Sequence, residues 1–170
     1  MNFRNTAFGI LAAIALSGCG SFPSTPDVMV QNAKEGKAYS DKDVFEVNRP
    51  IAQIESVFRK KADECLRAKI ESRRYEGGMY RREVRVYTPK VVADKQRVRL
   101  TVQTITVEGA TEGGPIPDDG WYILVADAYP VNAKTTRVES YVQWPGWRSA
   151  FRAVKHWSNG TNMGCPDLTE

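Results

Sequence analysis

The side chains that could carry catalytic or metal chemistry in this sequence are few. One histidine, His156, and three cysteines stand among 170 residues, and they have no metal-ligand spacing with acidic residues. The sequence holds no Walker or Rossmann phosphate loop and no G-x-S-x-G nucleophile motif. The paired acids Asp118-Asp119 stand in a stretch rich in glycine and proline, which is typical of turns rather than of general acid–base catalysis. We therefore predict a non-catalytic protein with no metal and no diffusible cofactor.

A concentration of positive charge is the more informative feature. Between Arg59 and Arg99 the chain has 14 Lys and Arg against 6 Asp and Glu. At the centre of this stretch, residues 73–82 (RRYEGGMYRR) interleave arginines with aromatic side chains. Arginine pairs bidentately with phosphate and carboxylate groups, so the run predicts contact with an anionic surface or with a partner. A solvated basic loop without any partner is the alternative. The predicted contact residues are Arg73, Arg74, Arg81, Arg82 and Arg85.

The N-terminal residues indicate export from the cytoplasm. Arg4 provides a positive start, and Ala7–Leu16 form an apolar run of ten residues. Such a run is too short for the roughly 20 residues that cross a bilayer, and is typical of a signal peptide. The segment Leu16-Ser17-Gly18-Cys19 resembles the lipobox of bacterial lipoproteins. The resemblance implies that residues 1–18 are removed and that Cys19 is diacylated. Gly20 after the cysteine implies an outer-membrane address on the periplasmic side.

Once Cys19 is lipidated, Cys65 and Cys165 are the two cysteines left, and they permit a single pairing. An exported location allows a disulfide, and closing a loop of about 100 residues would stabilise the fold by roughly 4–5 kcal/mol. Two buried thiols are the alternative, and a nucleophilic cysteine would depend on His156. Ordinary cleavage after Ala13-Ile14-Ala15 would instead leave Cys19 as a free thiol, but it would cut inside the apolar run.

Composition predicts one folded domain behind a tether. Residues 19–42 combine glycine, serine, proline and charges without periodicity, so we expect a lipidated cysteine followed by a flexible tether with a reach of roughly 25 Å. Residues 43–170 have the size of one domain. Hydrophobic residues make up 42 % of the chain and charged residues 26 %, which excludes a disordered or multi-span membrane protein.

Hydrophobic periodicity predicts an α+β fold with the order β-α-β-β-β-β-α, an antiparallel sheet with two helices on one face. Apolar residues recur every three or four positions over Ile51–Cys65, which predicts a helix after a short strand at Val44–Val47. A second helix follows Pro145, with Trp147 and Trp157 on its apolar face and His156 opposite them. Alternation predicts the other strands, with a bulge near Gln103-Thr104. These strands are expected at Val84–Tyr87, Val98–Val107, Trp121–Val131 and Thr136–Trp144.

These features predict a membrane-anchored envelope lipoprotein that acts as a binding or accessory subunit of an envelope assembly. It would use the basic region around Arg73–Arg85 or the exposed face of the sheet. Its partner would be an envelope protein, anionic lipid or peptidoglycan, and export excludes nucleic acid.

The alternative is a periplasmic module that holds an apolar small molecule between the sheet and the helices. Three tryptophans near the second helix could form an aromatic pocket, although the position of two of them on its apolar face favours packing against the sheet. Tyr122 and Tyr141 are expected to face solvent or a partner. The three tryptophans are Trp144, Trp147 and Trp157.

Overall fold

The computed structural model describes residues 22–37, 39–108, 120–143 and 145–169. Of the residues singled out above, Cys19, Asp118-Asp119 and Trp144 lie outside these ranges.

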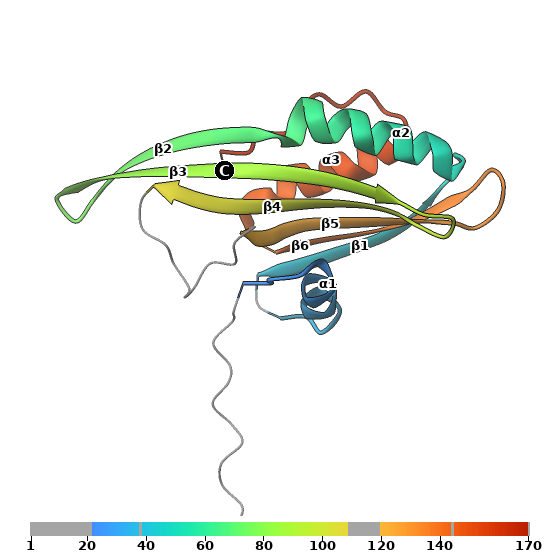
Figure 1. Ribbon diagram of the computed structural model, residues 1–170, viewed down its shortest axis with the longest axis horizontal. Coiled ribbons are helices and arrows are strands. Elements are labelled where there is room, and N and C mark those ends of the chain that lie inside the picture. The colour runs from blue at the N-terminus through green and yellow to red at the C-terminus, as the bar shows by residue number, and fades with distance from the viewer. Residues whose placement is uncertain (1–21, 38, 109–119, 144, 170) are drawn as a thin grey trace, which may run out of the picture.

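Six antiparallel strands form one sheet in the order β1-β6-β5-β4-β3-β2 (Figure 1). Two helices, α2 (Ile51–Lys61) and α3 (Arg148–Ser158), cover one face, and a third helix, α1 (Pro26–Lys34), covers the other. The predicted α+β fold is therefore confirmed, and α1 and one strand are added to the predicted order. The strands are β1 (Ser40–Val47), β2 (Ala68–Glu76), β3 (Met79–Ala93), β4 (Val98–Glu108), β5 (Trp121–Pro130) and β6 (Thr136–Gln143). A π-helical turn (Ala62–Leu66) follows α2, and a 3-10 turn (Pro145–Trp147) precedes α3.

The main core lies between the sheet and the helices α2 and α3. The predicted apolar faces of both helices point into it, with Ile54 and Phe58 from α2 and Trp157 from α3 fully or almost fully buried. Trp147 is also buried, and its ring centroid lies 4.9 Å from that of Tyr87 on β3. The predicted bulge is confirmed by a register shift between β4 and β5 at Val102/Gln103.

The prediction of a flexible tether over residues 19–42 is wrong for its described part. Thr25 caps α1 by accepting a hydrogen bond from the backbone N–H of Val28 at 3.2 Å, and Pro26 occupies the first turn, where its missing N–H costs nothing. Met29 and Ala33 pack against β5 and β6 in a second, smaller core. The helix buries few apolar residues, which is why periodicity did not indicate it.

Tyr141 belongs to this second core, where α1 covers it. Its side chain is buried, so the expectation that it faces solvent or a partner is wrong. Tyr122 is partly buried against the same core. Therefore α1 closes part of the sheet face that was expected to be open.

The start of β2 is a further correction. The helical spacing predicted one helix over Ile51–Cys65, and no strand was expected between it and Val84. Instead α2 ends at Lys61, the π-helical turn follows, and β2 begins at Ala68. Pairing with β3 and a tight glycine turn override the local helical pattern.

Candidate functional site: the projecting β2–β3 hairpin

The hairpin of residues 68–87 places the predicted arginines on two paired strands. Nine cross-strand pairs run from Ala68–Tyr87 to Glu76–Met79. The turn is made by Gly77 and Gly78, whose φ angles of +58° and +80° suit glycine and are those of the turn that matches strand twist.

The hairpin reaches well beyond β5, and its last residues reach beyond β4, whose pairing with β3 ends at Val84. Tyr87 pairs with Thr104 of β4, and Thr104 pairs with Trp121, the first residue of β5. The nine residue steps from Tyr87 to Gly78 extend about 30 Å at roughly 3.3 Å per residue. Figure 1 shows β2 and β3 extending well past β5, with β4 beside them for part of the way.

Arginines stand opposite one another in this hairpin. Arg73 pairs with Arg82, and Arg74 pairs with Arg81 in the backbone register. Like charges in directly opposed positions destabilise a sheet. The first pair is bridged by Glu71, which lies 2.6 Å from Arg73 and 2.9 Å from Arg82.

Two further ion pairs join arginines of the hairpin to glutamates. Arg82 also pairs with Glu108 at the end of β4. Arg85 pairs with Glu83 at 2.5 Å. Of the five predicted arginines, Arg85 alone was expected on a strand; the structure instead distributes all five along the two strands of a hairpin, and three of them form ion pairs with acids.

Hydrogen bonds from Arg82 and Arg73 lower the pKa of the Glu71 carboxyl from 4.5 to about 2. The same ion pairs raise the pKa of both guanidinium groups. Because the folded pKa of Glu71 lies below its ordinary value, the ion pairs are complete above pH 4.5 and are lost as the pH falls toward 2.

We predict that the carboxyl carbon of Glu71 titrates with a midpoint of about 2 when it is followed by NMR. In the Arg82→Gln variant the midpoint should rise toward 4.5, because the largest stabilising contact is removed. A midpoint near 4.5 in the unsubstituted protein would show that the bridge does not persist in solution.

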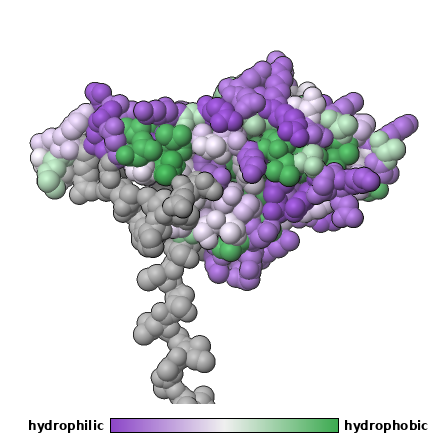
Figure 2. All heavy atoms as spheres, in the orientation of Figure 1, coloured by the Kyte–Doolittle hydropathy of each residue, from purple (hydrophilic) through white to green (hydrophobic). Residues whose placement is uncertain are grey.

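The tip of the hairpin exposes large side chains. Tyr75 is 78 % exposed, Met79 60 % and Tyr80 61 %, and the two tyrosines are opposite each other in the register. Figure 2 shows a mixed surface along this end of the molecule, with hydrophobic and hydrophilic residues side by side. Tyrosine, methionine and arginine are the residue types enriched at interfaces, so the tip has the composition of a contact surface.

A second polar cluster lies on the α1 side of the sheet and was missed in the sequence. Asp127 of β5 and Glu139 of β6 are directly opposed, and both are buried. Arg99 of β4 binds Asp127 with two parallel hydrogen bonds of 2.6 and 2.7 Å, and it binds Asp27 of α1 at 2.7 Å. The guanidinium therefore links α1 to the sheet.

Glu139 has partners of its own. The hydroxyl of Tyr141 donates to it at 2.6 Å, and Arg137 forms an ion pair with it. Burial and the nearby carboxylate of Asp127 raise the pKa of Tyr141. Because each buried carboxylate holds a cationic partner, the chemistry of the cluster is that of a structural link rather than of an acid–base pair.

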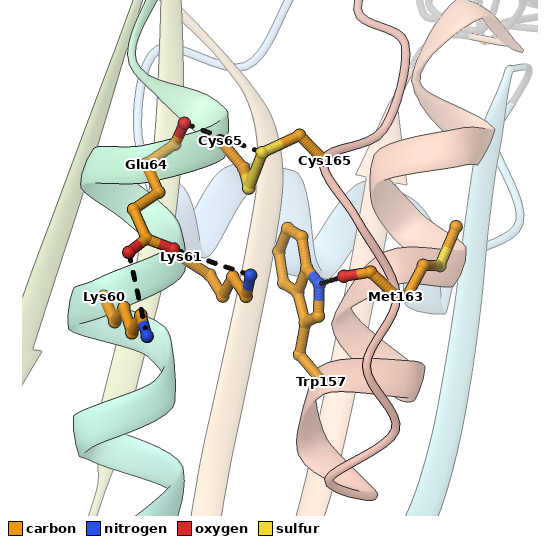
Figure 3. The surroundings of a disulfide bond; sticks show 7 residues. All are labelled: Lys60, Lys61, Glu64, Cys65, Trp157, Met163 and Cys165. Carbon is orange, nitrogen blue, oxygen red and sulfur yellow. Dashed lines mark hydrogen bonds and ion pairs between the residues drawn. A yellow bond between two sulfur atoms is a disulfide. The ribbon is translucent and has the colours of Figure 1, made fainter.

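The predicted disulfide joins Cys65, in the turn after α2, to Cys165 in the C-terminal segment, with the two Cα atoms 4.9 Å apart (Figure 3). Trp157 of α3 lies beside it, and its indole N–H donates to the backbone carbonyl of Met163 at 3.1 Å. Lys61 stands over the indole ring at 5.9 Å from its centroid. The disulfide and this hydrogen bond therefore fix the C-terminal segment against both helices.

The residues that could carry catalysis or bind a metal form no cluster of that kind in the described part of the chain. His156 is exposed on α3, on the side away from the core, as its place in the helix predicted. Among the described residues, no three His, Cys, Asp or Glu side chains come together as they would around a metal ion. Nor is any helix in these ranges long and apolar enough to cross a bilayer.

Comparison with known proteins gives little further information. No family model matches the chain, and no curated protein does. Among solved structures, a conserved protein from Geobacillus kaustophilus aligns at 14 % identity with a TM-score of 0.31, over 68 % of this chain and 85 % of the other. A TM-score of 0.31 is too low to assign a fold family.

Proposed function

We propose that this protein is a lipid-anchored, non-catalytic binding subunit of an envelope assembly, and that the β2–β3 hairpin is its contact surface. The lipobox-like segment that ends at Cys19 supports an anchor at the outer membrane, on the periplasmic side. A covalent lipid on that cysteine is the one prosthetic group that the proposal requires.

The observation that carries the proposal is the hairpin itself. It extends about 30 Å beyond β5 and exposes Tyr75, Met79 and Tyr80 at its tip. It places arginines opposite one another in the backbone register, an arrangement that is unfavourable in a sheet unless an acid bridges it, and residues that break a local rule of stability are those expected at functional surfaces.

The alternative, a module that holds an apolar molecule between sheet and helices, has less support. Trp147 and Trp157, which would line such a pocket, are buried among core side chains. The ring of Trp147 contacts Tyr87, and the indole N–H of Trp157 is taken up by a backbone carbonyl. Core packing accounts for both residues.

Replacing the four arginines nearest the turn is expected to reduce capture of the partner at least tenfold. After cross-linking in cells and affinity purification, the recovered amount of partner should fall by a factor of about ten or more. Truncating an arginine at an interface costs binding free energy of order 1 kcal/mol. The melting temperature should change little, since exposed ion pairs contribute little to stability. The substitutions are Arg73→Ser, Arg74→Ser, Arg81→Ser and Arg82→Ser.

A matched control removes the same charge from another surface. Four exposed arginines on the helix side serve for this purpose, and their replacement should leave recovery of the partner unchanged. Equal recovery of every co-purifying protein and lipid from both variants would exclude the hairpin as the contact surface. The control substitutions are Arg59→Ser, Arg67→Ser, Arg148→Ser and Arg152→Ser.

A further inference from the structure

The folded domain begins very close to the proposed lipid anchor. The backbone carbonyl of Pro23 accepts a hydrogen bond from the N–H of Tyr122 at 3.0 Å, and the ring of Phe22 lies 5.7 Å from that of Trp121. Three residue steps separate Cys19 from Phe22, and they span at most about 11 Å because consecutive Cα atoms are 3.8 Å apart. A lipid on Cys19 would therefore hold the start of β5 against the membrane surface.

The anchor leads into the face of the sheet that carries α1. Residues 22–25 run directly into α1, which lies on the side opposite α2 and α3 (Figure 1). A bilayer that holds Cys19 consequently faces the α1 side of the domain.

The two tyrosines at the tip of the hairpin, Tyr75 and Tyr80, belong to the same side. Tyr87 points toward α3, since its ring contacts Trp147. Side chains alternate along a strand, so Tyr80 and Arg82 point to the opposite face. Their cross-strand partners, Tyr75 and Arg73, share that face. The pairs Tyr75–Tyr80 and Arg73–Arg82 thus follow one another along the α1 side of the hairpin.

We propose that this face of the hairpin rests on the lipid head groups of the membrane in which Cys19 is anchored. The inference rests on the proposed function and names the partner of the same surface. Tyrosine rings are favoured at the level of the head groups, where one end of the ring is apolar and the other is hydrated.

The arginines fit the same partner. Each guanidinium has five N–H donors, so Arg73 and Arg82 keep donors beyond those used with Glu71 and, for Arg82, with Glu108. Residues 68–87 contain six Lys and Arg against three Glu, an excess that favours anionic lipid.

Photo-cross-linking of the lipidated, full-length protein tests this inference. The photoreactive analogue p-benzoylphenylalanine is placed at Tyr75 or Tyr80, in protein reconstituted in vesicles of phosphatidylethanolamine and phosphatidylglycerol and in intact cells. The same analogue at His156, exposed on α3 on the other side of the domain, is the control. All three sites are exposed, and an unchanged melting temperature confirms that each variant is folded.

We expect lipid adducts at Tyr75 and Tyr80 to exceed those at His156 several-fold in vesicles and in cells. Adducts with a protein in cells, without lipid adducts, would overturn the inference and leave the proposed binding subunit in place. Equal lipid labelling at the three sites would also overturn it. The anchor is tested separately, because Cys19→Ser should release the protein from the membrane fraction; a variant that stays there contradicts the proposed function itself.

Discussion

Replacing Cys65 and Cys165 with serine is expected to lower the free energy of unfolding by about 4–5 kcal/mol. The bond closes a loop of 100 residues, and in the chain-entropy model a loop of that length restricts the unfolded chain by about this amount. For a domain of this size each kcal/mol corresponds to about 2–4 °C, so the melting temperature should fall by roughly 10–20 °C.

Thermal unfolding followed by circular dichroism measures the effect. Reductant supplies the internal control: it should lower the melting temperature of the unsubstituted protein to that of the Cys65→Ser/Cys165→Ser variant and leave the variant unaffected. If the two proteins melt together under oxidising conditions, the disulfide does not contribute to stability.

A local consequence of removing the bond is expected in the C-terminal segment. That segment is fixed near Cys165, at the carbonyl of Met163 and at the carbonyl of Asp167, which accepts from Ser149 at 2.7 Å. Without the disulfide, two hydrogen bonds of about 1 kcal/mol each and the packing of Leu168 and Met163 against the core remain. Amide exchange around residue 165 should therefore increase more than exchange in α3.

The parts of the fold that could be predicted are those in which burial repeats along the chain. Helices α2 and α3 each bury one stripe, and that stripe includes Ile54 and Phe58 in the first and Trp157 in the second. The bulge was predicted from a slip in the alternating pattern, and the register shift at Val102/Gln103 is its cause.

Helix α1 could not be predicted, because it is stabilised by packing against β5 and β6 and buries too few apolar residues to show a stripe of its own. Met29 and Ala33 are its buried apolar residues, and their partners, Val125 and Tyr141, are more than 90 residues away in the sequence. The ion pair of Asp27 with Arg99 is equally remote.

The hairpin left a signal that could have been recognised. Residues 73–82 read nearly the same in both directions around Gly77-Gly78, and a two-glycine turn between such segments indicates a hairpin. The helical spacing that ends at Cys65 outweighed this signal. That spacing continues through the π-helical turn, which has no sequence mark of its own.

The polar cluster under α1 left a fainter signal. Asp127 interrupts the apolar run of β5, and a charge at such a position is expected only with a partner. Identifying Arg99 as that partner requires the pairing of β4 with β5, which brings Arg99 opposite Asp127.

This cluster leads to the second large effect. Asp127→Ala is expected to lower the free energy of unfolding by about 3–5 kcal/mol, because it removes the buried one of the two carboxylates on Arg99, in a site where water cannot replace it. The side chain of Asp127 is 2 % exposed and that of Arg99 13 %. Chemical denaturation of the oxidised protein measures the loss, with an unchanged m-value as evidence of the same two-state transition.

Two controls separate the buried charge from other causes. Asp27→Ala removes the second carboxylate on Arg99, but that side chain is 82 % exposed, so the loss should stay below about 1 kcal/mol. The double substitution Asp127→Leu with Arg99→Met removes both charges and should recover much of the stability lost in Asp127→Ala, since apolar replacement of a buried pair is often neutral. If Asp127→Ala costs no more than Asp27→Ala, the buried charge pair does not stabilise the packing of α1 on the sheet, and that packing depends on the other contacts of the segment, among them Met29, Ala33 and the hydrogen bond of Pro23 with Tyr122.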